Sequence, residues 1–324
     1  MSENGGLIGA YTLDGNGGGQ SLDWAGIRAW KPESGPLWVH LDRKDEEAQS
    51  WLEEEAGLNE VVSEALLADD PRPRMQMIGS GAVVILRGVN LNPGAEPDDM
   101  ISVRMWVEAD RIISLRSPKL MAIQDVRDEL ARGEGPCTSG QVLVAIAVHM
   151  GERIAPVIAN LDELIDESEE QVVDAPGHEL RRELGHIRRQ AISLRRYIAP
   201  QRDAIAGMAG AITPWLSDLD RMRLRELQDR TTRYVEDLDA LRERAAVVQE
   251  ELSGRLAEQM NRTMYVLSLV AGIFLPLGLL TGLLGINVGG MPGVEDDMAF
   301  WIVCAVLVAL AILGVWLFRR MRLF

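Results

Sequence analysis

The sequence predicts an α+β domain that leads into a long stalk helix and ends in two membrane-spanning helices. Two apolar runs near the C-terminus, 263–294 and 298–318, contain no charged residue. Before them, strand-like segments give way to long helical patterns at about residue 140. All but three of the 33 basic and three of the 49 acidic residues precede these runs, which excludes both a simple soluble enzyme and a mostly buried multi-span carrier.

These changes in pattern divide the chain into three predicted parts. Residues 1–140 are expected to form an α/β subdomain, residues 141–262 a helical bundle with a stalk helix, and residues 263–324 a two-span membrane region. The aqueous part is strongly acidic, since the whole chain carries a formal charge of −16. Such a surface repels nucleic acid and tolerates nearby cations.

Short apolar segments bounded by turn residues predict strands in the first part. These segments are Pro36 to Asp42, Ala82 to Val89, Ile101 to Val107 and Arg111 to Leu115. Pro93, Gly94 and Pro97 mark a turn between two of them. Helices are predicted at Asp45 to Ala56 and Lys119 to Arg132.

Long helices follow from residue 140 onward. Gly140 to Val173 and Glu179 to Ala211 are each predicted as one helix, separated by Ala175-Pro176-Gly177. The first carries acidic residues (Glu163, Asp166, Glu167, Glu169, Glu170) that either bind regulatory cations or form a solvated face. The second carries arginines that would pair with them (Arg181, Arg182, Arg188, Arg189, Arg195, Arg196).

From Pro214 a heptad pattern typical of a coiled coil begins. Its members recur at alternating steps of three and four residues: Leu224, Leu227, Thr231, Tyr234, Leu238, Leu241, Ala245, Val248 and Leu252. We expect one helix from near Pro214 through the first apolar run. A break near Gly254 is the alternative.

Each apolar run reaches the roughly 20 residues that a helix needs to cross a bilayer. Arginines flank the outer ends of the pair: Arg255 and Arg262 before the first run, and Arg319, Arg320 and Arg322 after the second. The link between them is acidic, with Glu295, Asp296 and Asp297. The positive-inside rule therefore predicts both termini in the cytoplasm and the link outside.

A stripe of small or weakly polar residues follows one face of the first run. It comprises Asn261, Met264, Ser268, Ala271, Leu275, Gly278 and Gly282. Such a stripe either lines a narrow pore or packs against a neighbouring helix. Two helices cannot enclose a pore, so a transport function requires several copies around an axis.

Several classes of site are not expected. Cys304 lies inside the second apolar run and Cys137 lies in the aqueous part, so we expect neither a disulfide nor a cysteine metal cluster. No cofactor is indicated. His40, His149, His178 and His186 lack the spacing of metal-ligand pairs and are interpreted as packed or surface residues. No nucleophile triad, phosphate loop or catalytic carboxylate pair stands out, so we expect no enzyme.

The end of the first run reads Gly285-Ile286-Asn287, followed by Met291-Pro292. With Phe274-Leu275-Pro276 upstream and two closing spans, this order resembles the CorA metal-ion transporter superfamily. Ile286 stands where the magnesium channels have methionine, which resembles the zinc-transporting ZntB branch. The stretches Leu86 to Gly94 and Asp99 to Arg104 are similar to the cytoplasmic signature of that branch.

The resemblance implies a homopentamer in the inner membrane with a funnel-shaped cytoplasmic domain. Gly285, Ile286 and Asn287 would form the filter at the pore entrance. Asn261, Met264, Leu267, Leu275 and Gly278 would line the pore, although Gly278 stands where the magnesium channels place a hydroxyl. The implied substrate is zinc, with cobalt, nickel, cadmium and magnesium as further candidates, and uptake would be coupled to protons.

The residues limit how a metal would pass. Five Asn287 amides would hold the outer water of a hydrated dication, and the runs offer no soft ligand for bare zinc. Glu295, Asp296 and Asp297 either concentrate cations at the mouth or only solvate a loop. Two other functions stay open: a magnesium or cobalt channel, and a membrane-anchored coiled-coil sensor that transports nothing.

Overall fold

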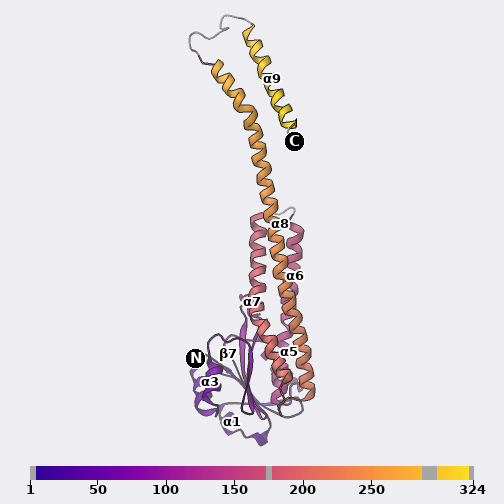
Figure 1. The fold of residues 1–324 in the computed structure, drawn as a ribbon. Helices are drawn as coiled ribbons and strands as arrows, with labels where there is room; N and C mark the ends of the chain where they lie inside the picture. Colours follow the sequence, from indigo (N-terminus) through magenta and orange to yellow (C-terminus); the bar gives the residue numbers. More distant parts are fainter. Residues whose placement is uncertain (1–4, 173–176, 287–297, 321–324) are drawn as a thin grey trace. The chain divides into compact units, whose positions relative to one another are not determined.

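A computed structural model describes residues 5–172, 177–286 and 298–320. The chain divides into two compact units, Met1–Gln249 and Glu250–Phe324, which are described separately below. The first unit holds a sheet and most of the helices. The second holds the apolar end of one long helix and the C-terminal helix (Figure 1).

A seven-stranded sheet organises the first unit, in the order β2-β1-β3-β7-β6-β5-β4. All neighbouring strands are antiparallel except β3 and β7, which pair in parallel from Leu37↔Arg111 to Asp42↔Arg116. The strands are β1 Leu7–Leu13, β2 Gly19–Leu22, β3 Leu37–Asp42, β4 Arg74–Ile78, β5 Gly81–Gly88, β6 Ile101–Val107 and β7 Arg111–Arg116.

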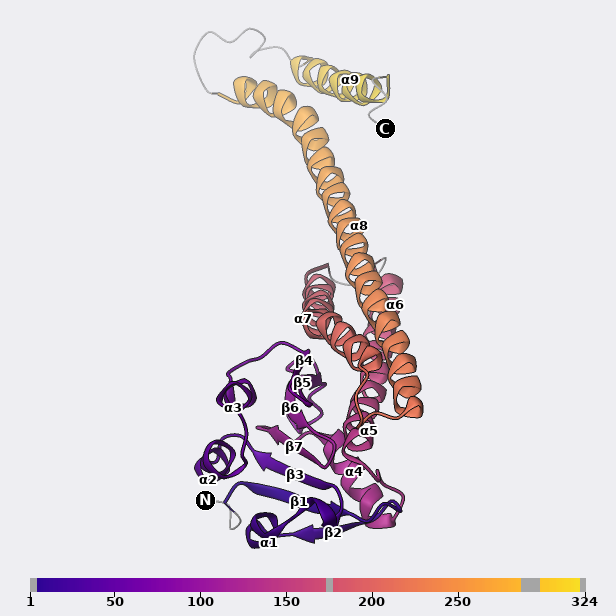
Figure 2. The same cartoon turned by 60° about the horizontal axis from the view of Figure 1, so that its bottom comes forward.

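Helices cover both faces of the sheet (Figure 2). Alternate side chains of each strand enter separate cores, so Val84 and Ile112 belong to one hydrophobic cluster and Ile85 and Ile113 to the other. One face carries α1 Trp24–Ala29, the short 3₁₀ turn Pro32–Ser34, α2 Glu46–Ser50 with the π-helical turn Trp51–Glu55, and α3 Glu60–Leu67. The other carries α4 Met121–Arg132, α5 Ser139–Glu152 and α7 Gly177–Gly210.

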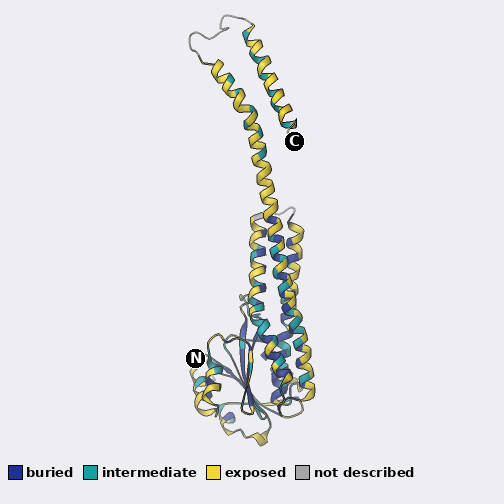
Figure 3. Ribbon diagram, in the orientation of Figure 1, coloured by how far each residue is buried: buried dark blue, intermediate teal, exposed yellow. Residues whose placement is uncertain are grey.

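The predicted long helix is confirmed. Helix α8 runs from Asp218 to Leu284 without a break at Gly254. Its predicted heptad residues are buried, except Tyr234, which is half-buried; all but Leu252 belong to the first unit. Leu252 is the last buried residue of the helix, and no described residue from Ser253 onward is buried (Figure 3).

The prediction of one helix over Gly140 to Val173 is wrong. The segment forms α5, which ends at Glu152, and α6 Ile154–Gln171. Pro156 explains the break. Its ring would clash with the Glu152 carbonyl four residues earlier, and its nitrogen has no hydrogen to donate, whereas both are tolerated in a first helical turn.

The predicted strands at β3, β5, β6 and β7 are confirmed, but β1, β2 and β4 were not expected. Strand β1 is buried at every third residue, because Leu7 and Ala10 enter one core and Leu13 enters the other. Strands β2 and β4 lie at the edges of the sheet and are largely exposed. The sequence of β2 shows no period-two apolar pattern, and the alternation in β4 is only four residues long.

Three helical stretches are long and apolar enough to cross a membrane, by length and composition. They are Ser139–Gln171, Asp218–Leu284 and Ala299–Phe318. Half of the apolar window in Ser139–Gln171 is buried inside the protein, because α5 packs its apolar residues on the sheet. The windows in α8 and in α9 (Ala299–Arg320) have no buried residue, which leaves their apolar surface available to lipid or to other subunits.

A fully buried histidine lies at the centre of the sheet. Arg116 donates from Nε to Nε2 of His40 (3.2 Å), so the imidazole proton is on Nδ1, which donates to Ser114 Oγ (2.8 Å). Ser114 also accepts from Trp38 and donates to the Val39 carbonyl. Burial first, and then the charges of Arg116 and Arg127, lower the pKa of His40 to about 3.

We predict that His40→Gln makes the domain less sensitive to acid. In the unfolded chain His40 binds a proton below pH 6.5, whereas in the folded chain it stays neutral down to about pH 3. Wild type should therefore lose about 1.4 kcal/mol per pH unit from this residue across that window. Thermal unfolding of both proteins at pH 7.5 and pH 5 measures it; equal acid-induced decreases in Tm would contradict the prediction.

Candidate functional site

The predicted pore-lining residues lie on the uncovered side of α8. Met264, Leu267 and Leu275 expose 62%, 68% and 71% of their surface, and Asn261 and Gly278 are also exposed. Most half-buried residues of this part of the helix recur on another face, at Tyr265, Leu269, Ile273, Leu277 and Leu280, and the small Ala271 of the stripe is half-buried as well. The described part of the chain therefore leaves the five predicted pore-lining residues exposed.

Helix α9 packs against α8 through small residues. A Cβ atom on Gly272 would lie 3.0 Å from the Phe318 ring, and one on Gly314 would lie 3.7 Å from the Ile273 side chain. Glycine at 272 leaves room for the Phe318 ring, and a Cβ at 314 would make an ordinary van der Waals contact; small residues of this kind are common where membrane helices meet. The half-buried face of α8 is thus the one that α9 covers.

The end of α8 combines a proline with glycines. Pro276 lies inside the helix, where its ring faces the carbonyl of Gly272, a residue without a side chain to crowd it further. The Thr281 hydroxyl donates to the carbonyls of Leu277 (3.0 Å) and Gly278 (3.1 Å). The Gly285 backbone amide donates to the Thr281 carbonyl (2.9 Å).

The helix ends just before the predicted filter. Gly285 and exposed Ile286 lie directly after α8. Asn287 and the acidic loop residues Glu295, Asp296 and Asp297 lie outside the described residues.

The uncovered stripe is chemically neutral. Between Thr263 and Ile286, α8 and the residues that follow it contain no carboxylate, histidine, lysine or arginine. A ring of such helices offers amide and backbone oxygens and apolar side chains to a passing ion. Groups of this kind hold a hydrated cation weakly, which suits fast entry and release.

The aqueous part of α8 is anchored to α6 by Arg244. Its guanidinium pairs with Asp162 (2.7 Å), Asp166 and Glu169 (2.9 Å), which are spaced along one side of α6. The expectation that arginines of the following helix pair with these acidic residues is wrong for Asp166 and Glu169, because their partner comes from α8. Of the six predicted arginines, Arg195 forms an ion pair within the described chain, with Asp239 of α8 (2.7 Å).

The charges around this anchor shift the pKa values of their neighbours. The hydrogen bonds that Arg244 donates to Glu169 and Asp166 raise its pKa above the usual value. Partial burial, followed by the charges of Asp162 and Glu236, raises the pKa of Asp237. Sequence reasoning missed Arg244 and Asp162, although Arg244 directly precedes the heptad residue Ala245, a position that flanks a helical seam.

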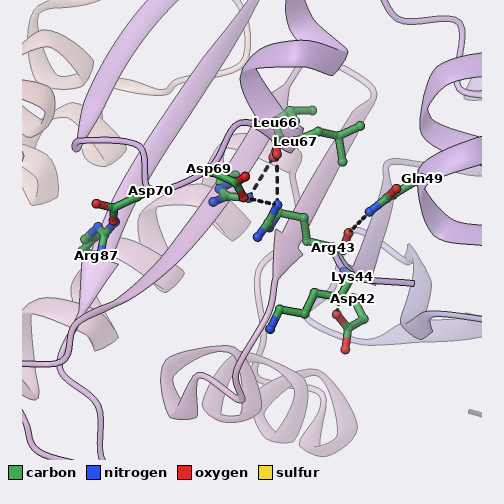
Figure 4. Close-up of polar contacts among 10 residues, drawn as sticks. Asp42, Arg43, Lys44, Gln49, Leu66, Leu67, Asp69, Asp70 and Arg87 are labelled. Atoms are coloured by element: carbon green, nitrogen blue, oxygen red, sulfur yellow. Dashed lines mark hydrogen bonds and ion pairs between the residues drawn. The ribbon is translucent and has the colours of Figure 1, made fainter. Parts of the chain in front are cut away.

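The signature stretch of the sequence builds a buried arginine node (Figure 4). Arg87 of β5 donates to the Met100 carbonyl (2.9 Å), pairs with Asp70 and stacks on the Tyr197 ring of α7 at 4.1 Å. Arg104 of β6 donates to the Leu66 carbonyl (3.2 Å). Burial, together with the charges of Arg43 and Arg87, lowers the pKa of Arg104 to about 10.

This node joins the sheet to the helices around it. The Arg87 backbone amide donates to Gln201 Oε1 of α7 (2.6 Å), and Arg43 donates to the Leu67 carbonyl (3.0 Å) and pairs with Asp69 (3.2 Å). The stretch that carries the family resemblance in the aqueous part therefore has a structural role in the described residues.

No group of three or more histidine, cysteine, aspartate or glutamate side chains could hold a metal ion within the described part of the chain. His149 lies between Glu129 (2.8 Å) and Glu152 (3.4 Å), and His178 and His186 are exposed on α7. The four histidines therefore lie apart from one another, in β3, α5 and α7.

Comparison with known proteins identifies the family. The model of the CorA-like Mg²⁺ transporter protein family matches residues 33–320. The chain belongs to this family. The CorA-like chain is 41% identical over 321 residues to the divalent cation transporter CmaX of Pseudomonas aeruginosa, covering 98% of this chain and 96% of that protein. It is 37% identical over 313 residues to the zinc transport protein ZntB of Yersinia pseudotuberculosis, covering 97% and 94%.

Solved structures agree with this assignment. The full-length CmaX structure matches the CorA-like chain with a TM-score of 0.87 and 40% identity, and covers 99% of both chains. The CorA magnesium transporter of Methanocaldococcus jannaschii shares the fold, with a TM-score of 0.80 at 18% identity over 96% and 97% of the two chains. The predicted family and fold class are confirmed.

We predict that Gly272→Leu disrupts the α8–α9 hairpin, because its side chain would occupy the space of the Phe318 ring. The amount of monodisperse protein extracted from membranes should fall severalfold, since overpacking at a tight contact costs about 1–3 kcal/mol. Gly254→Leu is the matched control, as a Cβ there also meets nothing within 4 Å and Gly254 lies outside the stripe. Equal yields of the two variants would contradict the packing described.

We predict that Arg244→Gln loosens α8 from α6. A network of partly exposed ion pairs contributes about 1 kcal/mol, so the Tm should fall by about 2–4 °C. Arg230→Gln, which removes one pair with Glu226 on the same helix, is the control and should change the Tm less. High salt should reduce the difference between the variants; a difference that grows with salt would contradict an ionic anchor.

Proposed function

We propose that this chain transports divalent metal cations across the inner membrane, with zinc as its main substrate and uptake into the cytoplasm coupled to protons. Family membership and the names of two relatives support the transport of divalent cations. The resemblance of Gly285-Ile286-Asn287 to the ZntB loop supports zinc. The pattern of flanking arginines supports cytoplasmic termini.

The transporting unit in this proposal is a homopentamer. The observation that carries it is the neutral stripe on α8, which lies exposed on a face that α9 does not cover. Five such faces around an axis would enclose a pore lined by Asn261, Met264, Leu267, Leu275 and Gly278. Lipids would contact the outer faces of α9.

The filter would select hydrated dications. A ring of Asn287 amides at the end of α8 would hold the water of a hydrated ion, and Glu295, Asp296 and Asp297 would raise the local cation concentration. Because α8 and α9 contain no carboxylate, histidine or lysine between Thr263 and Phe318 outside the acidic link, proton coupling would use groups at the mouth or in the aqueous part.

A magnesium or cobalt channel is the second candidate. The neutral lining favours it, because oxygen ligands suit magnesium and the stripe offers no nitrogen or sulfur ligand except the Met264 thioether. Competition separates the two functions. In proteoliposomes, excess magnesium should leave zinc uptake nearly unchanged if zinc is the substrate, and should abolish it if the protein is a magnesium channel.

We predict that proteoliposomes containing this protein take up zinc, and that uptake is faster when the outside is acidic. Asn287→Ala should lower the initial rate at least about tenfold, because the loss of a positioned set of polar ligands raises the barrier by about 1.4 kcal/mol or more. Asn160→Ala is the control, because Asn160 is an exposed residue of α6, and this variant should retain the wild-type rate. A zinc-sensitive dye inside the vesicles measures both. Uptake no faster than in protein-free vesicles would refute transport and favour a membrane-anchored sensor.

A further inference from the structure

Helix α7 presents a row of arginines to solvent that we call the basic ridge: Arg181, Arg182, Arg188, Arg189 and Arg196. Its buried side is formed by Leu180, Leu184 and Ile187 and their successors at helical spacing. The arginines lie on the opposite side, and Ile192 among them exposes 47% of its surface. The ridge is therefore a charged surface with an apolar contact point.

The basic ridge has no ion pair with the part of the chain that the structure describes. In the same region, the ion pairs between helices are made by other arginines, Arg244 and Arg195, with acidic residues of α6 and α8. Five neighbouring guanidinium groups repel one another, and a chain of net charge −16 has ample acidic side chains to neutralise them. A uniformly basic row in such an acidic protein thus indicates an anionic partner.

A shorter acidic surface lies on α6. Glu163, Glu167 and Glu170 are exposed and recur at steps of four and three residues, so they share one side of the helix. They form no ion pair with a described residue, in contrast to Asp162, Asp166 and Glu169, which Arg244 neutralises. We call Glu163, Glu167 and Glu170 the acidic ridge.

The two ridges cannot neutralise each other within one chain. Helices α6 and α7 pack together through their buried sides, where Ile158, Leu161 and Ile165 of α6 lie. Each ridge lies on the side of its helix away from these residues. One chain therefore carries two complementary surfaces that are both turned outward.

We propose that the basic ridge of one copy of this chain binds the acidic ridge of the next copy. The inference rests on the homo-oligomer proposed above and identifies a contact that holds its aqueous parts together. Because the two surfaces differ, the contact is head-to-tail, and such contacts generate a closed ring when the rotation between copies closes. Complementary charges also fix the register and exclude like-to-like pairing of copies.

Cross-linking between differently tagged copies tests the contact without altering any ridge charge. In a background without Cys137 and Cys304, one copy carries Ala159→Cys, exposed beside the acidic ridge, and the other carries Ile192→Cys. Co-expressed and treated with a bifunctional maleimide, the pair should give a mixed-tag product. Glu53→Cys, exposed on the other side of the sheet, replaces Ala159→Cys as the control and should give none.

Charge reversal tests whether electrostatics carries the contact. Arg188→Glu with Arg189→Glu should lower the mixed-tag yield at least about tenfold at low salt, where the Debye length exceeds about 10 Å. Adding Glu163→Arg and Glu167→Arg in the same chain should restore it. Arg72→Glu with Arg74→Glu makes the same change in net charge on exposed residues elsewhere and should leave the yield unchanged.

Three outcomes would overturn the proposal. The first is the absence of mixed-tag product, and the second is a yield that charge reversal leaves unchanged. The third is a mixed-tag product that is lost when phosphatidylglycerol is added but not when phosphatidylcholine is added. This third outcome would assign the basic ridge to anionic lipid. Light scattering on the wild-type protein separates a failure of the proposed contact from a failure of the proposed function. A multi-subunit particle without the cross-link refutes only the contact, whereas a single-chain particle refutes the oligomeric pore as well.

Discussion

The uncovered face of α8 is the constraint on which the rest of the molecule depends. A hairpin of two helices gives each helix one covered side, and Gly272 and Gly314 set that side on α8 and α9. What remains is a long surface too apolar for water and, at the stripe, too rich in small and weakly polar residues to be explained by lipid contact alone. The proposed association of several copies would give this surface a partner and, at the same time, would enclose a path for ions.

The first unit is built to hold the aqueous part of α8 firmly. Its heptad residues are buried, Arg244 neutralises three carboxylates of α6, and Arg195 reaches Asp239 from α7. The arginine node of β5 and β6 fastens α7 to the sheet in turn. Because α8 is one helix from Asp218 to Leu284, a rearrangement of these contacts acts on the same helix that carries the proposed pore lining.

Sequence patterns predicted the long elements well because their signals are long. The heptads identified α8, the uncharged runs identified the apolar helices, and strands buried on both faces, such as β5, stood out as apolar runs. The edge strands β2 and β4 were missed because they are short and largely exposed, and β1 was missed because its buried residues enter both cores. The break at Arg153 was missed because the effect of Pro156 depends on a carbonyl four residues away.

The site could be predicted only in part. The stripe on α8 follows from spacing alone, but that it avoids α9 depends on which glycines the second helix meets. The partner of the α6 carboxylates could not be read from the sequence either, because Arg244 lies some 75 residues away and competes with a nearer row of arginines. Long-range pairing is set by the packing of whole helices, which local charge patterns do not encode.

The buried histidine in β3 has a consequence for where acid acts on this protein. The apolar helices contain no carboxylate, histidine or lysine between Thr263 and Ile286 or within Ala299–Phe318, so a fall in pH changes no such charge inside them. His40, by contrast, ties its neutrality to an intact sheet through Ser114 and Arg116. Acidification around the first unit would therefore weaken the scaffold first and leave the hydrophobic hairpin chemically unaltered.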